Sequence, residues 1–143
     1  MKKLNIILVL SFLISINCLA PPSHIKFNLR SHYISILKQS ELTLENVKKY
    51  IQLVDIKYPE IVIRQYILET GWGKSNICKT YNNLFGFRGA NGYFKYKHWT
   101  ESIESYKRFQ DRKYKEGCYY TFLEKVGYSE SNKYVKTLKL IKI

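Results

Sequence analysis

Residues 59–70 read PEIVIRQYILET, and GWGKS follows at residues 71–75. Pro59 suits the first turn of a helix, and the residues after it are apolar on nearly every side of a helix. Gly71 and Gly73 can take the left-handed conformation that ends helices. We therefore predict a helix from Pro59 to about Thr70 that is buried in the core.

Amphipathic helices are predicted on both sides of this buried helix. Before it, Thr43 can cap a segment whose apolar residues recur at helical spacing: Leu44, Val47, Ile51 and Val54. After it, Thr100 can cap a second segment with Ile103, Tyr106 and Phe109 inward and the pairs Glu104/Arg108 and Asp111/Lys115 outward. A last amphipathic helix is predicted from about Glu130 to Ile141.

Residues 76–98 look irregular apart from one short hairpin. Residues 90–92 are expected to turn the chain between residues 85–88 and 93–96. The predicted fold class is therefore α+β and mainly α, with a single small β element.

Length and charge limit the classes of function. A chain of 143 residues is enough for one domain and too short for two ordinary ones. Its 24 Lys and Arg residues against 11 Asp and Glu residues give a formal charge of +13. Such a charge favours a polyanionic partner: nucleic acid, an anionic membrane surface or an acidic wall polymer. Because no nucleic-acid recognition motif accompanies the scattered basic residues, we expect no nucleic-acid partner.

The first 20 residues resemble an export signal. A cationic start, Met1 to Lys3, precedes an apolar run from Leu4 to Ile16 that is too short to anchor stably in a bilayer. Cleavage after Ala20 would meet Pro21, whereas residues 15–18 form a degenerate lipobox that would attach a lipid to Cys18. Both routes stay open, so we expect an exported protein: periplasmic, an outer-membrane lipoprotein tethered through Cys18, or extracellular.

The remaining chain divides into a predicted tether and one domain. Residues 21–39 begin with Pro-Pro and show no sustained period, although residues 32–37 can form a short strand or helix. Residues 40–143 form the domain, which we expect to be a monomer.

Cysteine and histidine patterns give no metal site. His24, His32 and His98 are isolated in the sequence, so neither a metal nor another cofactor is expected. In an oxidising compartment Cys78 and Cys118 can form a disulfide, and two free thiols are the alternative. A nucleophile formed by one of these cysteines with His98 also stays open.

Glu69 is the candidate catalytic residue. A carboxylate at the end of an apolar helix loses hydration and faces the negative end of the helix dipole, and both effects raise its pKa. A carboxyl group that stays protonated near neutral pH is what a general acid for glycosidic cleavage requires. A solvated carboxylate with no catalytic role is the alternative.

Two motifs carry a resemblance to a known family. Residues 67–75, ILETGWGKS, and residues 82–88, NNLFGFR, resemble the glucosaminidase domain of bacterial peptidoglycan hydrolases, glycoside hydrolase family 73. The resemblance extends over roughly residues 40 to 140. It implies a lysozyme-like fold in which a helical lobe and a small β-hairpin lobe flank a groove. It also implies hydrolysis of the β-1,4 bond after N-acetylglucosamine in peptidoglycan glycan strands.

The resemblance assigns roles to several residues. Glu69 matches the family's catalytic acid, and Tyr128 resembles a groove tyrosine that supports the reaction. The predicted substrate-binding residues are Asn83, Leu84, Phe85 and Gly86, with Tyr96 and Trp99 as saccharide platforms; core packing is the alternative for Leu84 and Phe85. Trp72 is expected to wedge the helix end against the hairpin, and Tyr134 is expected to pack.

The hairpin at residues 89–92 lacks the acidic residue that longer relatives carry. Glycosidases normally use two carboxylates. Glu101 and Glu104 follow the hairpin, but helix-start and ion-pair roles explain them. We therefore favour substrate assistance, in which the N-acetyl oxygen attacks the anomeric carbon. A lytic transglycosylase and a non-catalytic cationic glycan-binding protein are the alternative functions.

Overall fold

A computed structural model describes the backbone of residues 23–143 and the side chains of residues 29–143. The chain forms two compact units, residues 1–33 and residues 34–143. The predicted export signal and Cys18 lie outside the described residues. Helix α2 (Ser23–Leu37) covers most of the predicted tether, and the function of this segment stays a prediction. Within the described residues, no helix is long and apolar enough to span a membrane.

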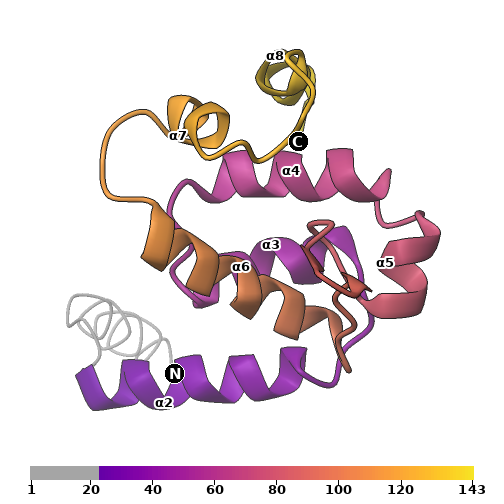
Figure 1. Cartoon of the computed structure of the whole chain (residues 1–143). Coiled ribbons are helices and arrows are strands. Elements are labelled where there is room, and N and C mark those ends of the chain that lie inside the picture. Colours follow the sequence, from indigo (N-terminus) through magenta and orange to yellow (C-terminus); the bar gives the residue numbers. More distant parts are fainter. Residues whose placement is uncertain (1–22) are drawn as a thin grey trace, which may run out of the picture. The chain divides into compact units, whose positions relative to one another are not determined.

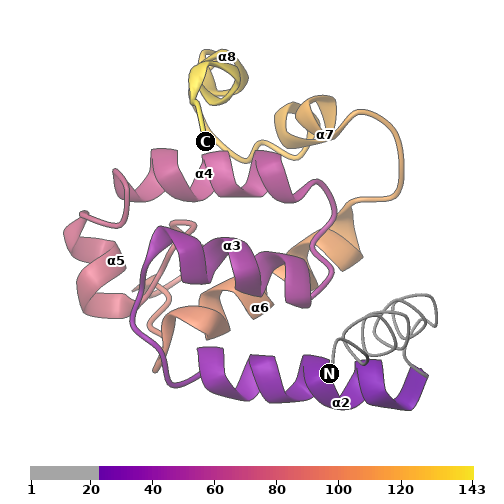
Figure 2. The same ribbon diagram turned by 180° about the vertical axis from the view of Figure 1, so that it is seen from behind.

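The predicted central helix is confirmed as α4 (Pro59–Thr70). Pro59 occupies the first turn, and Gly71 ends the helix with a φ of 54°. Val62, Tyr66 and Ile67 are buried. In the unit formed by residues 34–143, α4 lies between α3 and α6 on one side and α7 and α8 on the other (Figure 1; Figure 2).

Helices α3 (Leu44–Leu53) and α6 (Trp99–Lys113) are the two predicted amphipathic helices. The Thr43 hydroxyl caps α3 by accepting the amide of Asn46 at 3.1 Å. The cap predicted for α6 is wrong by two residues, because His98 rather than Thr100 is the N-cap. The predicted outward ion pairs are also replaced by others: Lys107–Asp111 and Lys38–Glu104.

Three short helices complete this unit. Helix α5 (Asn76–Tyr81) lies in a stretch predicted to be irregular, and α7 (Tyr119–Lys125) was not predicted. The last helix, α8 (Tyr134–Leu140), begins four residues later than predicted. The hydroxyls of Ser129 and Ser131 accept the amides of Ser131 and Lys133, and such local bonds compete with helix formation.

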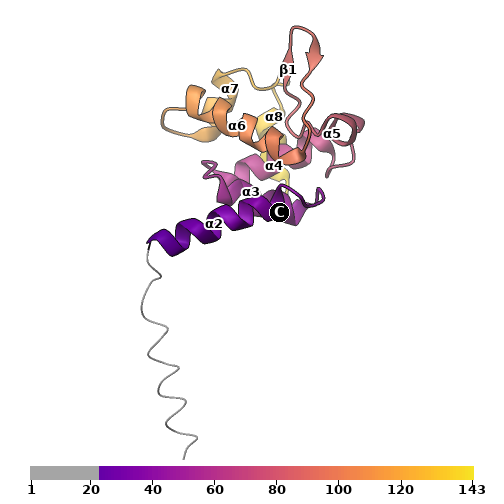
Figure 3. The same ribbon diagram turned by 90° about the horizontal axis from the view of Figure 1, so that it is seen from below.

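The predicted hairpin is present. Strands β1 (Arg88–Gly89) and β2 (Gly92–Tyr93) pair antiparallel, and the hairpin stands out from the helices beside α5 (Figure 3). A Cβ at Gly89 would stand 2.7 Å from the exposed Phe94 ring, so a larger residue there would require this ring to move. The described unit therefore has a helical body with one small β-hairpin, as the α+β, mainly α prediction requires.

The Thr43 cap can be tested through stability. We expect Thr43→Ala to lower the free energy of unfolding by about 1 kcal/mol, because one amide of the first turn loses its acceptor. Urea unfolding monitored by circular dichroism measures the change. The control is Thr43→Ser, which keeps the hydroxyl; an equal loss in both variants would show that the cap bond contributes nothing.

Candidate active site

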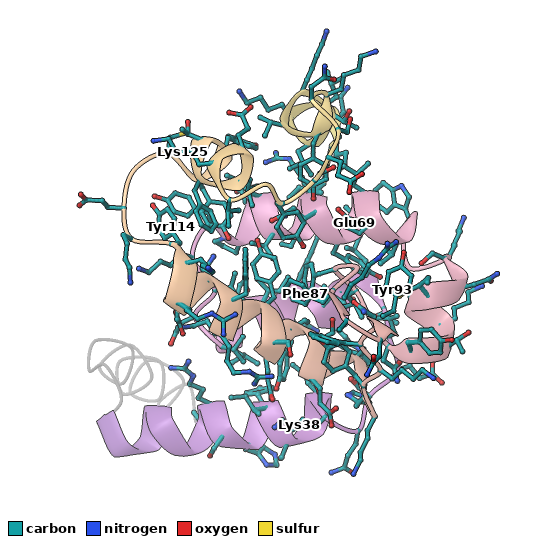
Figure 4. All side chains as sticks on the ribbon, viewed as in Figure 1. Lys38, Glu69, Phe87, Tyr93, Tyr114 and Lys125 are labelled. Atoms are coloured by element: carbon teal, nitrogen blue, oxygen red, sulfur yellow. The ribbon has the colours of Figure 1, made fainter. Side chains whose placement is uncertain are left out.

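Glu69 lies at the carboxyl-terminal end of α4 and is half-buried (Figure 4). Burial raises the pKa of the Glu69 carboxyl above its ordinary value of 4.5. The Tyr134 hydroxyl donates a hydrogen bond to Glu69 Oε1 at 2.8 Å, which partly opposes this rise. The site therefore holds a carboxyl group with an elevated pKa and one fixed hydrogen-bond donor.

Tyr134 reaches Glu69 because α8 packs against α4. Val135 and Leu138 of α8 are buried, and Tyr134 is 9% exposed. Gln65, one turn before Glu69 on α4, donates from Nε2 to the Tyr134 hydroxyl at 3.2 Å. The sequence prediction missed this role of Tyr134. The available signal was the pair Gln65 and Glu69, two polar residues on one face of an apolar helix that need a buried partner.

Gly86 lies next to the other carboxylate oxygen. A Cβ at Gly86 would stand 3.6 Å from Glu69 Oε2, and the residue has a φ of 66°. Glycine is favoured at such a φ, and it leaves the space beside Oε2 open. The two oxygens of Glu69 therefore differ: Oε1 is bonded to Tyr134, and Oε2 faces the Gly86 backbone.

Gly86 also lines a cleft of about 450 Å³. The cleft has aromatic walls with one basic and one acidic residue at its edge, and its lining is formed by Phe85, Gly86, Phe87, Arg88, Phe109, Val126, Gly127, Tyr128 and Glu130. A second cavity of about 310 Å³ shares Glu130 and is also lined by Tyr134. Aromatic walls with a few polar groups are typical of ligand pockets.

Tyr128 lines the cleft, as a groove residue should, but it does not bond to Glu69. Its hydroxyl donates to the carbonyl of Phe85 at 3.2 Å, and its ring stacks on that of Tyr134 at 5.7 Å. Burial strongly raises the pKa of the Tyr128 hydroxyl, and the nearby Tyr134 and Glu69 add to the rise. Tyr128 is therefore a neutral phenol that fixes Phe85 and Tyr134.

The other predicted substrate-binding residues are placed differently. Asn83 is 2% exposed and bonds to the backbone of Phe87 and Phe94, so it holds the segment that carries Gly86. Leu84 and Trp99 are also buried, and the Trp99 indole donates to the Ser40 carbonyl at 2.8 Å. The structure gives these three side chains places in the core rather than on the cleft wall.

Two further aromatic residues differ in exposure. Tyr96 is half-buried, and its amide donates to the Tyr81 carbonyl at 2.9 Å. Trp72 is 54% exposed and has a φ of 63°, so it is not packed between the helix end and the hairpin as predicted. An exposed indole three residues after Glu69 is available for contact with a sugar ring.

The contacts of Cys78, Cys118 and His98 do not support a disulfide or a cysteine–histidine nucleophile. Cys78 is a buried free thiol and Cys118 an exposed one. His98 bonds to Thr100 and to the Ser40 carbonyl at the start of α6. Among the described residues, no three His, Cys, Asp or Glu side chains are grouped so that they could hold a metal ion.

Comparisons with known proteins show the family of the chain. The model of the glucosaminidase family, described as mannosyl-glycoprotein endo-beta-N-acetylglucosaminidase, matches residues 44–142. The exo-glucosaminidase LytG of Bacillus subtilis (strain 168) is 29% identical over an alignment of 119 residues, and the match covers 76% of this chain. The chain spans 40% of the length of that relative. No solved structure matches.

The bond from Tyr134 can be tested by its effect on Glu69. We expect Tyr134→Phe to raise the pKa of Glu69 further, because the carboxylate loses a donor that stabilises its charged form. Carbon-13 NMR of labelled glutamate, assigned with Glu69→Gln, measures the titration.

The matched control for Tyr134→Phe is Tyr50→Phe, which removes a buried hydroxyl that donates to Glu104 at 2.6 Å. A Glu69 titration that is unchanged or moves to lower pH in Tyr134→Phe would contradict the assigned bond.

Proposed function

The chain belongs to the glucosaminidase family, and from this premise we propose that it is a peptidoglycan hydrolase that cleaves the β-1,4 bond after N-acetylglucosamine. The observation that carries the proposal is a carboxyl group of raised pKa, Glu69, whose Oε2 lies beside Gly86 of an aromatic cleft. The name of the relative from Bacillus subtilis supports a substrate that contains glucosamine.

Glu69 acts as the general acid in this proposal. The protonated carboxyl group transfers its proton from Oε2 to the glycosidic oxygen as the bond between this oxygen and the anomeric carbon breaks. Tyr134 occupies Oε1, so Oε2 is the oxygen that is left for the substrate. The raised pKa keeps part of the Glu69 population protonated at a pH where an ordinary glutamate is ionised.

We further propose that the substrate supplies the nucleophile. The carbonyl oxygen of the N-acetyl group bonds to the anomeric carbon while the leaving alcohol takes the proton of Glu69. The Glu69 carboxylate then removes a proton from water, whose oxygen attacks the anomeric carbon and releases the N-acetyl oxygen. The configuration of the anomeric carbon is retained because it is inverted twice.

The contacts of the acidic residues near the hairpin support this route. The Glu101 carboxylate accepts the amide of Lys97 at 3.0 Å. Glu104 accepts from Tyr50 and pairs with Lys38 at 3.0 Å, so both residues have structural partners. Glu130 is exposed and lines the cleft, which makes it the carboxylate that could serve an inverting reaction instead.

Glu130→Gln decides between these two routes. Under substrate assistance we expect activity close to wild type and retention in the fresh product, measured by NMR of the released anomer. If Glu130 is instead the general base of an inverting reaction, Glu130→Gln should lower the rate roughly 10² to 10⁴-fold. The control is Glu60→Gln, because Glu60 is exposed and lines neither of the two cavities. Clear inversion would exclude the substrate-assisted route.

Glu69→Gln tests the proposed enzyme itself. We expect purified peptidoglycan to be cleaved roughly 10² to 10⁴-fold more slowly by this variant than by wild type. The variant should remain folded, since its amide oxygen can still accept from Tyr134. Because the raised pKa of Glu69 destabilises the folded state as pH rises above 4.5, the variant should gain thermal stability relative to wild type over this pH range.

Two outcomes of that digestion would overturn parts of the proposal. If neither wild type nor Glu69→Gln clears peptidoglycan faster than buffer alone, the protein is a non-catalytic glycan-binding protein. If mass spectrometry finds anhydro sugar ends among the products, the protein is a lytic transglycosylase, which closes the sugar on itself instead of admitting water.

We also propose that the protein acts outside the cytoplasm, as an exported protein that binds an anionic wall. The formal charge of +13 supports this location, since wall glycans carry acidic stems or attached polymers. Such long-range attraction weakens with salt.

A further inference from the structure

A buried chain of hydrogen-bonding side chains runs from the start of α4 to Glu69. We call it the buried chain, and its members, in order, are Gln110, Tyr119, Tyr106, Gln65 and Tyr134. The first four members are each at most 1% exposed. The buried chain follows α4, whose 12 residues span about 18 Å.

The direction of donation is set at the far end by the backbone of Lys57. The Lys57 amide donates to Gln110 Oε1 at 2.7 Å, and Gln110 Nε2 donates to the Lys57 carbonyl at 2.8 Å. An amide N–H can only donate and a carbonyl oxygen can only accept, so the side-chain amide of Gln110 has one possible orientation. Gln110 Nε2 must therefore donate to the Tyr119 hydroxyl, 2.9 Å away.

Each later member then has one role left. The Tyr119 hydroxyl accepts from Gln110, so its own proton goes to the Tyr106 hydroxyl at 2.8 Å. The Tyr106 hydroxyl therefore donates to Gln65 Oε1. With Oε1 held in this way, Gln65 Nε2 donates to the Tyr134 hydroxyl. The Tyr134 proton is thereby directed to Glu69 Oε1. Every bond in the buried chain donates toward Glu69.

We propose that the buried chain holds Tyr134 as a permanent donor to Glu69 Oε1 and so selects Oε2 as the oxygen that carries the catalytic proton. Gln110, Tyr119, Tyr106 and Gln65 are positioning residues in this account, which rests on the proposed function. If the direction reversed, protonated Glu69 would donate from Oε1 to Tyr134, and its proton would point away from Gly86 and the cleft. Aligned hydrogen bonds also strengthen one another.

The other groups near Glu69 do not compete with Tyr134 as its hydrogen-bond donor. Among the described residues, Tyr134 from α8 and Tyr128 from the segment before α8 interact electrostatically with Glu69. Tyr128 gives its proton to the Phe85 carbonyl, and the Phe85–Gly86 segment brings backbone beside Oε2. The hydrogen bond to the Glu69 carboxylate therefore comes from Tyr134.

Tyr106→Phe tests the proposal by removing the hydroxyl that fixes the orientation of Gln65. The Gln65 side-chain amide can then turn over, so that its Oε1 accepts from Tyr134 and Tyr134 accepts from protonated Glu69. We expect kcat on peptidoglycan to fall roughly tenfold and the alkaline limb of its pH profile to move to higher pH, because the reversed bonds favour neutral Glu69. Tyr119→Phe leaves Tyr106 as the donor to Gln65 Oε1, so its effect should be smaller.

Tyr50→Phe is the matched control, since it removes a buried hydroxyl bonded to Glu104 instead. We expect Tyr50→Phe to lose thermal stability while keeping the wild-type pH profile. The proposal is overturned if Tyr106→Phe shows the pH profile of Tyr50→Phe.

Carbon-13 NMR of Glu69 separates this proposal from the proposed function. A higher Glu69 titration midpoint in Tyr106→Phe than in wild type supports the buried chain even if peptidoglycan is not cleaved. Equal midpoints contradict the buried chain even if the wild type is an active hydrolase.

Discussion

Most faces of α4 carry apolar side chains, so this helix must be covered by α3 on one side and by α8 on another. Covering it removes water from its polar residues as well. Gln65 is fully buried and Glu69 is half-buried at the end of the same helix. Each needs a hydrogen-bond partner from the covering helices, because an unpaired buried polar group is costly.

That need links the fold to the candidate chemistry. Helix α8 supplies Tyr134 to Glu69, and α6 supplies Tyr106 to Gln65. Burial raises the pKa of Glu69, and Tyr134 limits the rise while it occupies Oε1. The same packing that stabilises α4 therefore leaves Oε2 beside Gly86, where the proposed function requires a proton donor.

Local sequence signals were enough to predict α4, α3, the hairpin and the raised pKa of Glu69. Pro59, Gly71 and the apolar pattern between them act within a few residues, so the prediction of α4 needed no tertiary contact. The role of Tyr134 could not be predicted in this way, because it depends on α8 packing 65 residues away along the chain. The exposure of Trp72 and the burial of Trp99 likewise follow from tertiary packing rather than from residue type.

The central claim is that burial at the end of α4 gives Glu69 the protonation of a general acid. Carbon-13 NMR titration of Glu69 in the wild-type protein, without substrate, measures this property directly. The account predicts a titration midpoint clearly above 4.5. A midpoint at or below 4.5 would mean that Glu69 is an ordinary ionised carboxylate, and the assignment of the acid to this residue would fail.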